Sequence, residues 1–230
     1  MSLSEKDILY LDNHLIIVHK KPGELVQVDQ TGDLSLEEKV KQYLKVRFQK
    51  PGDVFLGVIH RIDRPVSGAV VFARTSKALV RMNELIKKGG MKKIYWAIVK
   101  QAPQPESAEL RHFLLRNTRL NKTTAFATPR PDAKESVLAY RTIAQSDRYF
   151  LLEIDLITGR HHQIRAQLAS INCPIRGDLK YGFPRSNTDG GIDLHARQVS
   201  FIHPVSKELL NITCPVRNDV LWKSFEQSVV

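Results

Sequence analysis

The sequence predicts an α+β fold with a mixed, mostly antiparallel sheet, flanking helices and a central basic cleft. Segments with strand character outnumber those with helical periodicity, and several strands follow one another without the crossover helix that a parallel pair needs. Of the 230 residues, 42% are hydrophobic and 26% are charged, which is typical of a globular chain with one substantial core. Because no internal repeat, low-complexity tract or linker interrupts the pattern, we expect one domain over residues 1–230.

The first half of the chain alternates apolar runs with turn residues. Lys20-Lys-Pro-Gly23 predicts a turn after the first run, and Ser35-Leu-Glu-Glu38 has the form of a capping box that starts a helix. A second helix is expected over 76–88, closed by Gly89-Gly90. Strands are expected at 15–18, 54–59, 69–73 and 93–100. In the last of these, Ile94, Trp96 and Ile98 should face one side and Tyr95, Ala97 and Val99 the other.

The second half predicts strands on both sides of one helix. Residues 108–157 supply several strand-like runs separated by Pro, Asn and Asp, and further strands are expected at 199–202 and 208–213. Between them, Gly159 should open a helix that runs to about Ile171. Ile164, Leu168 and Ile171 would form its apolar stripe.

The charge of the chain favours a polyanionic partner. Lys and Arg number 35 and Asp and Glu 24, which gives a formal net charge of +11. Nucleic acid is one explanation of this excess, and a basic surface that only keeps the protein in solution is the other. The region between Arg111 and Arg148 holds eight Lys or Arg against three Asp or Glu, which suits a basic hairpin.

Several classes of protein are disfavoured by what the sequence contains. Its two cysteines, Cys173 and Cys214, form no Cys-x-x-Cys pair, which argues against a disulfide scaffold and a cysteine zinc site. No run approaches the ~18 apolar residues of a membrane span, and the first residues have no long apolar segment of a signal peptide. We therefore expect a cytoplasmic protein without a membrane partner.

The first candidate site is the segment from Ile59 to Gly68, which lies between two predicted strands. Arg61 and Arg64 flank one carboxylate, that of Asp63. A guanidinium nearby favours the ionised form of a carboxyl group, so Asp63 would be available as a nucleophile or base. The alternative is that Asp63 only holds a turn through an ion pair with arginine.

The second candidate site is Thr158-Gly-Arg-His-His-Gln-Ile-Arg165. If the helix starts at Gly159, then Arg160, His161 and His162 crowd its N-terminal turn, where the helix dipole is unfavourable for cations. A bound phosphate would make this arrangement favourable, whereas a solvated basic helix start is the alternative. A metal site built from His60, Asp63 and these histidines is disfavoured, because adjacent helical side chains point about 100° apart.

Together these segments resemble the signatures of the RluA-type RNA pseudouridine synthases. His60-Arg-Ile-Asp63 with Ser67-Gly68 is similar to the family's catalytic motif, and Thr158–Arg165 to its Gly-Arg-x-His-Gln-x-Arg segment. The remaining matches occur in the family's order: Lys20-Lys-Pro-Gly23, Lys93-Ile-Tyr95, Gly177-Asp178, Tyr181-Gly182 and Phe201-Ile-His-Pro204. The resemblance spans about residues 8–215 and implies a pseudouridine synthase-like fold.

The resemblance implies an isomerase that converts uridine in structured tRNA or rRNA to pseudouridine without a cofactor or metal. It assigns catalysis to Asp63, to Tyr95 against the uracil, and to Arg165, which would pair with Asp63. RNA contacts are implied for His60, Arg61, Arg64, Arg160, His162 and Gln163, with Arg61 entering the RNA stack. Ile164 and Ile202 would line the substrate pocket. We expect a monomer.

Two departures from the family pattern accompany this resemblance. Val66 stands where many members have Thr, which removes a hydroxyl near the turn. Many relatives also carry an N-terminal RNA-binding domain, and we expect none here. The alternatives that remain are an RNA-binding protein without catalysis, which would not need Asp63, Tyr95 and Arg165 together, and a phosphotransfer or hydrolytic enzyme. The latter would need a glycine-rich phosphate loop or a metal cluster.

Overall fold

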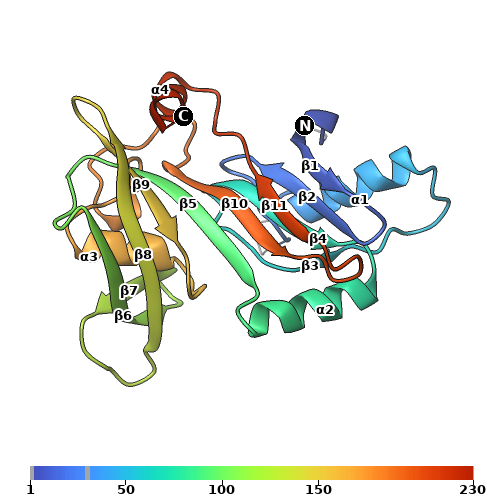
Figure 1. The fold of residues 1–230 in the computed structure, drawn as a ribbon, viewed down its shortest axis with the longest axis horizontal. Helices are drawn as coiled ribbons and strands as arrows, with labels where there is room; N and C mark the ends of the chain where they lie inside the picture. Colours follow the sequence, from blue (N-terminus) through green and yellow to red (C-terminus); the bar gives the residue numbers. More distant parts are fainter. Residues whose placement is uncertain (1–2, 29–31, 230) are drawn as a thin grey trace. The chain divides into compact units, whose positions relative to one another are not determined.

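A computed structural model describes residues 3–28 and 32–229, and the chain divides into two compact units (Figure 1). Unit 1 comprises residues 1–91 and 196–215, and unit 2 comprises residues 92–195 and 216–230. The unit boundaries fall inside two strands, β5 (Met91–Val99) and β10 (Leu194–Ile202). Each unit is described by itself.

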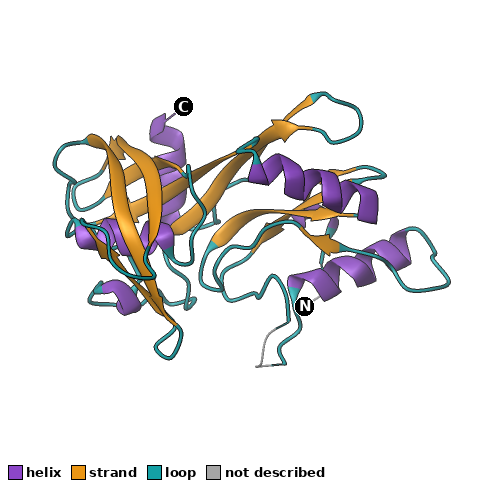
Figure 2. Cartoon of the chain, turned by 90° about the horizontal axis from the view of Figure 1, so that it is seen from below, coloured by secondary structure: helices purple, strands orange, loops and turns teal. Residues whose placement is uncertain are grey.

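Unit 1 is a strand layer with helices on it. In the order β1-β2-β4-β10 its strands lie side by side, β11 pairs with β10, and β3 pairs with β4. The β1–β2, β2–β4 and β10–β11 pairs are antiparallel. The elements are η1 (Glu5–Asp7), β1 (Ile8–Leu11), β2 (Leu15–Lys20), α1 (Leu36–Arg47), β3 (Gly57–Val58), β4 (Ser67–Ala73), α2 (Ser76–Lys87) and β11 (Leu209–Thr213). Helices flank these strands, as Figure 2 shows.

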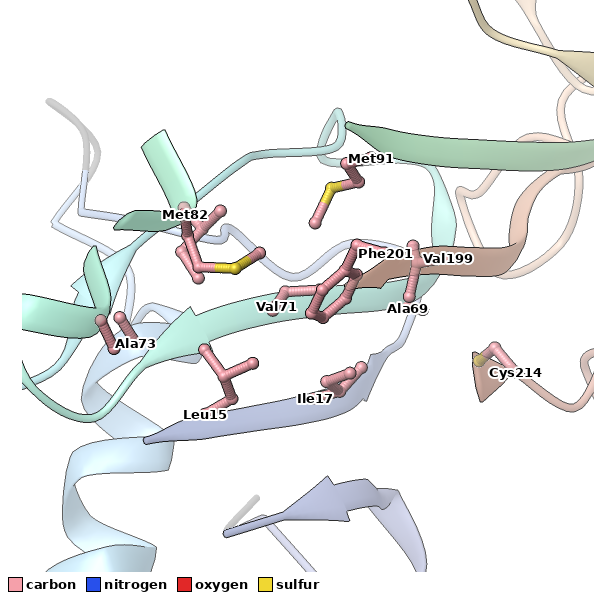
Figure 3. Packing of buried hydrophobic residues seen from close by; sticks show 12 residues of the cluster. Leu15, Ile17, Ala69, Val71, Ala73, Met82, Met91, Val199, Phe201 and Cys214 are labelled. Carbon is pink, nitrogen blue, oxygen red and sulfur yellow. The ribbon is translucent and has the colours of Figure 1, made fainter. Parts of the chain in front are cut away.

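The core of unit 1 follows from the alternation of side chains along β2 and β4. Leu15 and Ile17 of β2 and Val71 of β4 are fully buried on one face. Met82 of α2 and Phe201 of β10 pack against that face (Figure 3). Burial of such side chains stabilises the fold by about 1.5–3 kcal/mol each, so this cluster is a rigid base for the loops at the strand ends.

Both predicted helices of unit 1 are confirmed. Ser35 accepts a hydrogen bond from the Glu38 backbone N–H, and the Glu38 side chain accepts one from the Ser35 N–H, which completes the capping box of α1. Helix α2 begins after Thr75, whose hydroxyl accepts from the Ala78 N–H. It ends at Lys87, and Gly89 then adopts the left-handed conformation, with φ +73°.

The strand expected over 54–59 is much shorter in the structure. Only Gly57 and Val58 form strand β3, opposite Ala73 and Phe72 at the end of β4. Strands β2 and β10 lie on the two sides of β4. Only the end of β4, at Phe72 and Ala73, is therefore left for β3 to pair with. The expectation of a long strand here is therefore wrong: Leu56 and Ile59 are buried outside any strand, and Phe55 is 48% exposed.

Unit 2 is built on an antiparallel sheet in the order β5-β9-β8-β6-β7. Its strands after β5 are β6 (Ser107–Asn117), β7 (Lys122–Phe126), β8 (Lys134–Gln145) and β9 (Phe150–Asp155). Its helices are α3 (Gln163–Ser170), η2 (Leu179–Tyr181) and α4 (Val220–Val229). Every strand pair of this sheet is antiparallel, which confirms the predicted, mostly antiparallel α+β class.

The predicted alternation in β5 is confirmed. Trp96 and Ile98 belong to one buried cluster, in which Trp222 and Phe225 of α4 cover them. Ile94 packs against the same cluster. Tyr95, one position on, therefore points to the opposite face of the strand.

The helix expected from Gly159 starts later, at Gln163, and ends at Ser170. His162, with φ 51°, adopts the left-handed conformation, which a helix interior excludes. Arg160, His161 and His162 therefore lie in a turn before the helix and not in its first helical turn.

Candidate functional site

Asp63 lies in the loop between β3 and β4 of unit 1. Its neighbours Ile62 and Val66 are buried, while Asp63 itself is partly exposed. The Asp63 carbonyl accepts a hydrogen bond of 3.0 Å from the Val66 N–H, which closes a tight turn around Pro65. Buried anchors on both sides hold a partly exposed carboxylate in a defined place.

The backbone at position 68 requires glycine. Its φ is +124°, and a Cβ atom at this position would lie 2.4 Å from the Ala196 backbone nitrogen in β10. No side chain fits at that distance, so only glycine lets β4 and β10 approach each other here. The Ser67-Gly68 pair thus sets where β4 starts and where the Asp63 loop ends.

Lys20 supports the Asp63 loop, a role that its place in the Lys20-Lys-Pro-Gly23 turn did not indicate. Its side chain is fully buried, and its ammonium group donates hydrogen bonds to the carbonyls of Lys21 (3.0 Å), Arg64 (2.9 Å) and Val66 (2.6 Å). Burial lowers the pKa of Lys20 to about 7, against the opposing effects of Glu24 and Asp63, which raise it. The buried lysine therefore connects the end of β2 to both sides of Pro65.

The arginines around Asp63 differ in their contacts. Arg64 donates from Nε to the Gly23 carbonyl (3.0 Å) and from Nη2 to Asp33 (2.6 Å), so it ties the Lys20–Gly23 turn to the loop. Arg61 is exposed. The Nε2 atom of His60 accepts a hydrogen bond of 3.2 Å from the Val71 N–H, so this ring braces β4.

Tyr95 and Arg165 both lie in unit 2. Tyr95 sits in β5 opposite Ile154 of β9 and is buried. Arg165 is buried in α3, where its Nε donates to Asp178 Oδ2 at 2.7 Å and its Nη2 donates to Asp178 Oδ1 at 2.9 Å. Because Asp63 belongs to unit 1, the assembly of these three residues into one catalytic group stays a prediction, as does the pairing of Arg165 with Asp63.

His162 is part of the interior of unit 2. Its Nδ1 shares a hydrogen bond of 2.9 Å with the Tyr181 hydroxyl, which also accepts a hydrogen bond from the Thr123 N–H. Burial, followed by the positive charge of Arg165, lowers the pKa of His162 to about 2. The neutral, buried ring differs from the charged phosphate ligand that the sequence suggested, because the ring is enclosed by its own unit.

Gln163 also has an internal role. Its Oε1 accepts hydrogen bonds from the Thr158 hydroxyl (2.8 Å) and the Arg160 N–H (3.0 Å), and its Nε2 donates to the Val137 carbonyl (3.1 Å). The amide thus fixes the turn before α3 against β8. The Arg160 side chain is exposed and can reach an external phosphate.

The two predicted pocket residues have different surroundings. Ile164 is buried at the start of α3. Ile202, at the end of β10 in unit 1, is 46% exposed. An exposed isoleucine is available for an apolar contact with a ligand, and Ile164 supports the helix that carries Arg165.

The sequence did not indicate the roles of Lys20, Asp178 and Tyr181. All three stand in segments that were matched to the family, but none carried an assigned function. The signal that could have found Lys20 is a lysine at the end of an apolar strand, where a buried ammonium group needs carbonyl partners. For Asp178 no local signal exists, because its partner lies on another element.

Two further findings concern metals and membranes. Within residues 3–28 and 32–229, no group of three or more His, Cys, Asp or Glu side chains is arranged to hold a metal ion. In the same residues no helix combines the length and the apolar character needed to cross a bilayer.

Comparison with known proteins gives consistent matches. The family described as RNA pseudouridylate synthase matches residues 14–170. The tRNA pseudouridine synthase C of Vibrio cholerae serotype O1 is 31% identical over 220 residues, which cover 88% of this chain and 87% of that protein. An uncharacterized RNA pseudouridine synthase of Bacillus subtilis (strain 168) is 30% identical over 89% of this chain, and the chain spans 66% of that relative's length.

A solved structure has the same fold. The human RNA pseudouridylate synthase domain containing 4 superposes with a TM-score of 0.80 at 22% identity, over 97% of this chain and 93% of that one. The chain spans about two thirds of several curated relatives, among them the ribosomal large subunit pseudouridine synthase C of Vibrio cholerae, which is 30% identical over 64% of its length.

Proposed function

Because the chain belongs to the RNA pseudouridylate synthase family, we propose that it isomerises a uridine in structured tRNA or rRNA to pseudouridine. In this reaction the N1–C1′ glycosidic bond breaks, the uracil turns, and a C5–C1′ bond forms; the proton on C5 moves to N1. Atoms and electrons balance within the substrate, so the reaction needs no cofactor, metal or co-substrate.

The observation that carries this proposal is the family match over residues 14–170, which includes Asp63, Tyr95 and Arg165. The local geometry of each unit supports the roles. Asp63 is a partly exposed carboxylate on a loop held by the buried Lys20. Arg165 is a buried guanidinium in a fixed orientation. In the proposed site Asp63 is the essential carboxylate, Tyr95 lies against the uracil, and Arg165 orients Asp63.

RNA binding is proposed to use cations that are exposed on the chain. A base inside a helical stack cannot reach a carboxylate, so the uridine must leave the stack at a cost of a few kcal/mol. Arg61 and Arg160 are both exposed, which supports Arg61 in the RNA stack and Arg160 on a phosphate. Loops and bulges lower the cost of extruding a base, which favours structured tRNA or rRNA as substrate. Names of relatives include both substrate classes.

Two coarser expectations belong to the same proposal. We retain the cytoplasm as the compartment, because that is where tRNA and rRNA are available to a bacterial-type enzyme of this family. We also retain a monomer as the working form.

The proposal is tested by Asp63→Asn. We expect pseudouridine formation in RNA from cells lacking the gene to fall on the order of 10³-fold, with the circular dichroism spectrum and RNA affinity unchanged. Asp53→Asn, an exposed aspartate of the same unit, is the matched control and should keep full activity. Turnover by Asp63→Asn at the rate of the control would refute the role of Asp63. RNA binding without pseudouridine formation by the wild-type protein on total RNA would favour an RNA-binding protein instead.

The substrate is then identified by mapping pseudouridines in total RNA from cells with and without the gene. A position that loses its pseudouridine in the deletion strain, and regains it with the wild-type gene but not with Asp63→Asn, is the substrate. If no position changes, the proposed activity is refuted for the RNAs of that cell.

A further inference from the structure

The guanidinium of Arg165 is held along one edge by Asp178. Two parallel hydrogen bonds, 2.7 Å from Nε and 2.9 Å from Nη2, join it to the two carboxylate oxygens. The Arg165 and Asp178 side chains are 5% and 1% exposed. A bidentate pair of this kind fixes both the position and the plane of the guanidinium. Asp178 accepts hydrogen bonds from two of the five N–H groups of the Arg165 guanidinium. The direction in which the opposite edge of the guanidinium points is therefore fixed.

The face of the same guanidinium is covered by Tyr181. The Arg165 Cζ atom lies 5.0 Å from the centre of the tyrosine ring. The tyrosine ring is itself fixed, because its hydroxyl accepts from the Thr123 N–H at 2.8 Å and shares a hydrogen bond of 2.9 Å with His162 Nδ1. Arg165 is therefore restrained in its plane by Asp178 and across its plane by Tyr181.

The backbone of Asp178 is equally well held. Its N–H donates to the Ile175 carbonyl, and its own carbonyl accepts from the N–H of Tyr181. Ile175 forms a bridge with Val99 of β5, and the Arg176 N–H donates to the Ile98 carbonyl at 2.9 Å. The segment that carries Asp178 is thus bonded to the strand that carries Tyr95.

Stability alone does not account for this pair. A buried ion pair gains little over apolar side chains of the same volume, because desolvation offsets the attraction between the charges. A bidentate geometry does restrict a flexible arginine to a single orientation. Such an orientation matters where the other edge of the guanidinium must meet a partner at a defined place.

We propose that Asp178 is a positioning residue for the isomerisation: it fixes Arg165 so that the opposite edge of the guanidinium acts in the reaction, and Tyr181 supports the same orientation. This inference rests on the proposed function for the role of Arg165 itself. Asp178 touches neither substrate nor reacting atoms, and its effect passes through Arg165.

The kinetic test compares Asp178→Asn, Arg165→Lys and the double variant by single-turnover pseudouridine formation with enzyme in excess. We expect Asp178→Asn to slow the reaction about 10- to 100-fold while the Kd for RNA changes less than threefold. In the double variant the two effects should not multiply, because both remove the same oriented group. The control is Asp189→Asn, which removes the exposed carboxylate that accepts from Arg217 in the same unit and should keep the wild-type rate.

A second readout does not depend on activity. In an NMR spectrum of ¹⁵N-labelled protein, the Arg165 Nε–H should exchange slowly with water in the wild type and rapidly in Asp178→Asn. A slowly exchanging Nε–H in a folded Asp178→Asn, a wild-type rate for that variant, or effects that multiply in the double variant would each overturn the inference.

Because removal of a counter-ion can also unfold a protein, a second variant with a smaller side chain is tested beside Asp178→Asn. Asp178→Ser leaves room for water beside the guanidinium and is measured at a temperature where circular dichroism shows a complete fold. Failure of both variants to fold at any temperature would overturn the inference, because the pair would then be a requirement for folding. A wild-type protein without any pseudouridine formation refutes the proposed function, and the NMR result still decides whether Asp178 orients Arg165.

Discussion

Replacing Lys20 by methionine tests whether burial next to the Asp63 loop lowers the pKa of Lys20. The wild-type ammonium donates to three carbonyls, two of which flank Pro65 next to Asp63. Burial lowers its pKa from 10.5 to about 7. Among the charges around it, Glu24 and Asp63 raise this pKa, and Arg64 and Lys39 lower it.

The sign of the pH effect follows from the lowered pKa. Between about pH 7 and pH 10.5 the unfolded chain holds a proton on Lys20 that the folded chain has released. Stability rises with pH wherever the unfolded state binds more protons. The free energy of unfolding contributed by Lys20 should therefore rise as the pH increases through this window, by at most about 1.4 kcal/mol per pH unit.

Methionine has a similar length and does not titrate, so it isolates this effect. We expect the difference in unfolding free energy, wild type minus Lys20→Met, to increase by roughly 2–3 kcal/mol between pH 7.5 and pH 9.5. Urea unfolding at each pH, followed by circular dichroism, measures the difference. Other groups titrate equally in both proteins and cancel.

The matched control is Lys88→Met, at the exposed end of α2 in the same unit. Its difference from wild type should stay constant with pH. If the Lys20→Met difference is equally constant from pH 7.5 to 9.5, then Lys20 keeps an ordinary pKa and the burial argument is refuted. A difference that falls with increasing pH would show that the folded protein binds the proton more tightly than the unfolded chain does.

Further predictions concern Gly68 and Arg160. Gly68→Ala should lower the free energy of unfolding by about 3 kcal/mol or more, because a Cβ would lie 2.4 Å from the Ala196 backbone at φ +124°. Urea unfolding measures the loss, and Gly52→Ala, whose Cβ would meet no atom within 4 Å, is the control. Equal stabilities of the two variants would contradict the steric argument. Arg160→Ala should weaken RNA binding and reduce the slope of log K against log salt by about 1. An unchanged slope, or the same loss in the exposed Arg148→Ala, would remove Arg160 from the phosphate contacts.

Local sequence was sufficient where the interactions are local. Ser35 and Glu38 lie three residues apart and form the capping box that the pattern predicted. The alternation of Trp96 and Ile98 with Tyr95 along β5 follows from the pleat of a strand, and the cluster around Trp222 confirms it. The helix start at Gln163 was missed because it depends on Thr158 and on the left-handed His162, whose conformation leaves no simple periodicity.

The amino-acid order by itself determined the antiparallel class, the helix caps and the motif positions that identify the family, because propensity, capping and strand alternation act over a few residues. Only the tertiary structure decided which side chains and carbonyls bond to the residues of those motifs. The Lys20 ammonium meets carbonyls 44 and 46 residues away, and Arg165 meets Asp178 on a different element. The partner of a buried charge is the polar group that packing places next to it. Because that group can lie anywhere in the sequence, no fixed spacing along the chain predicts it.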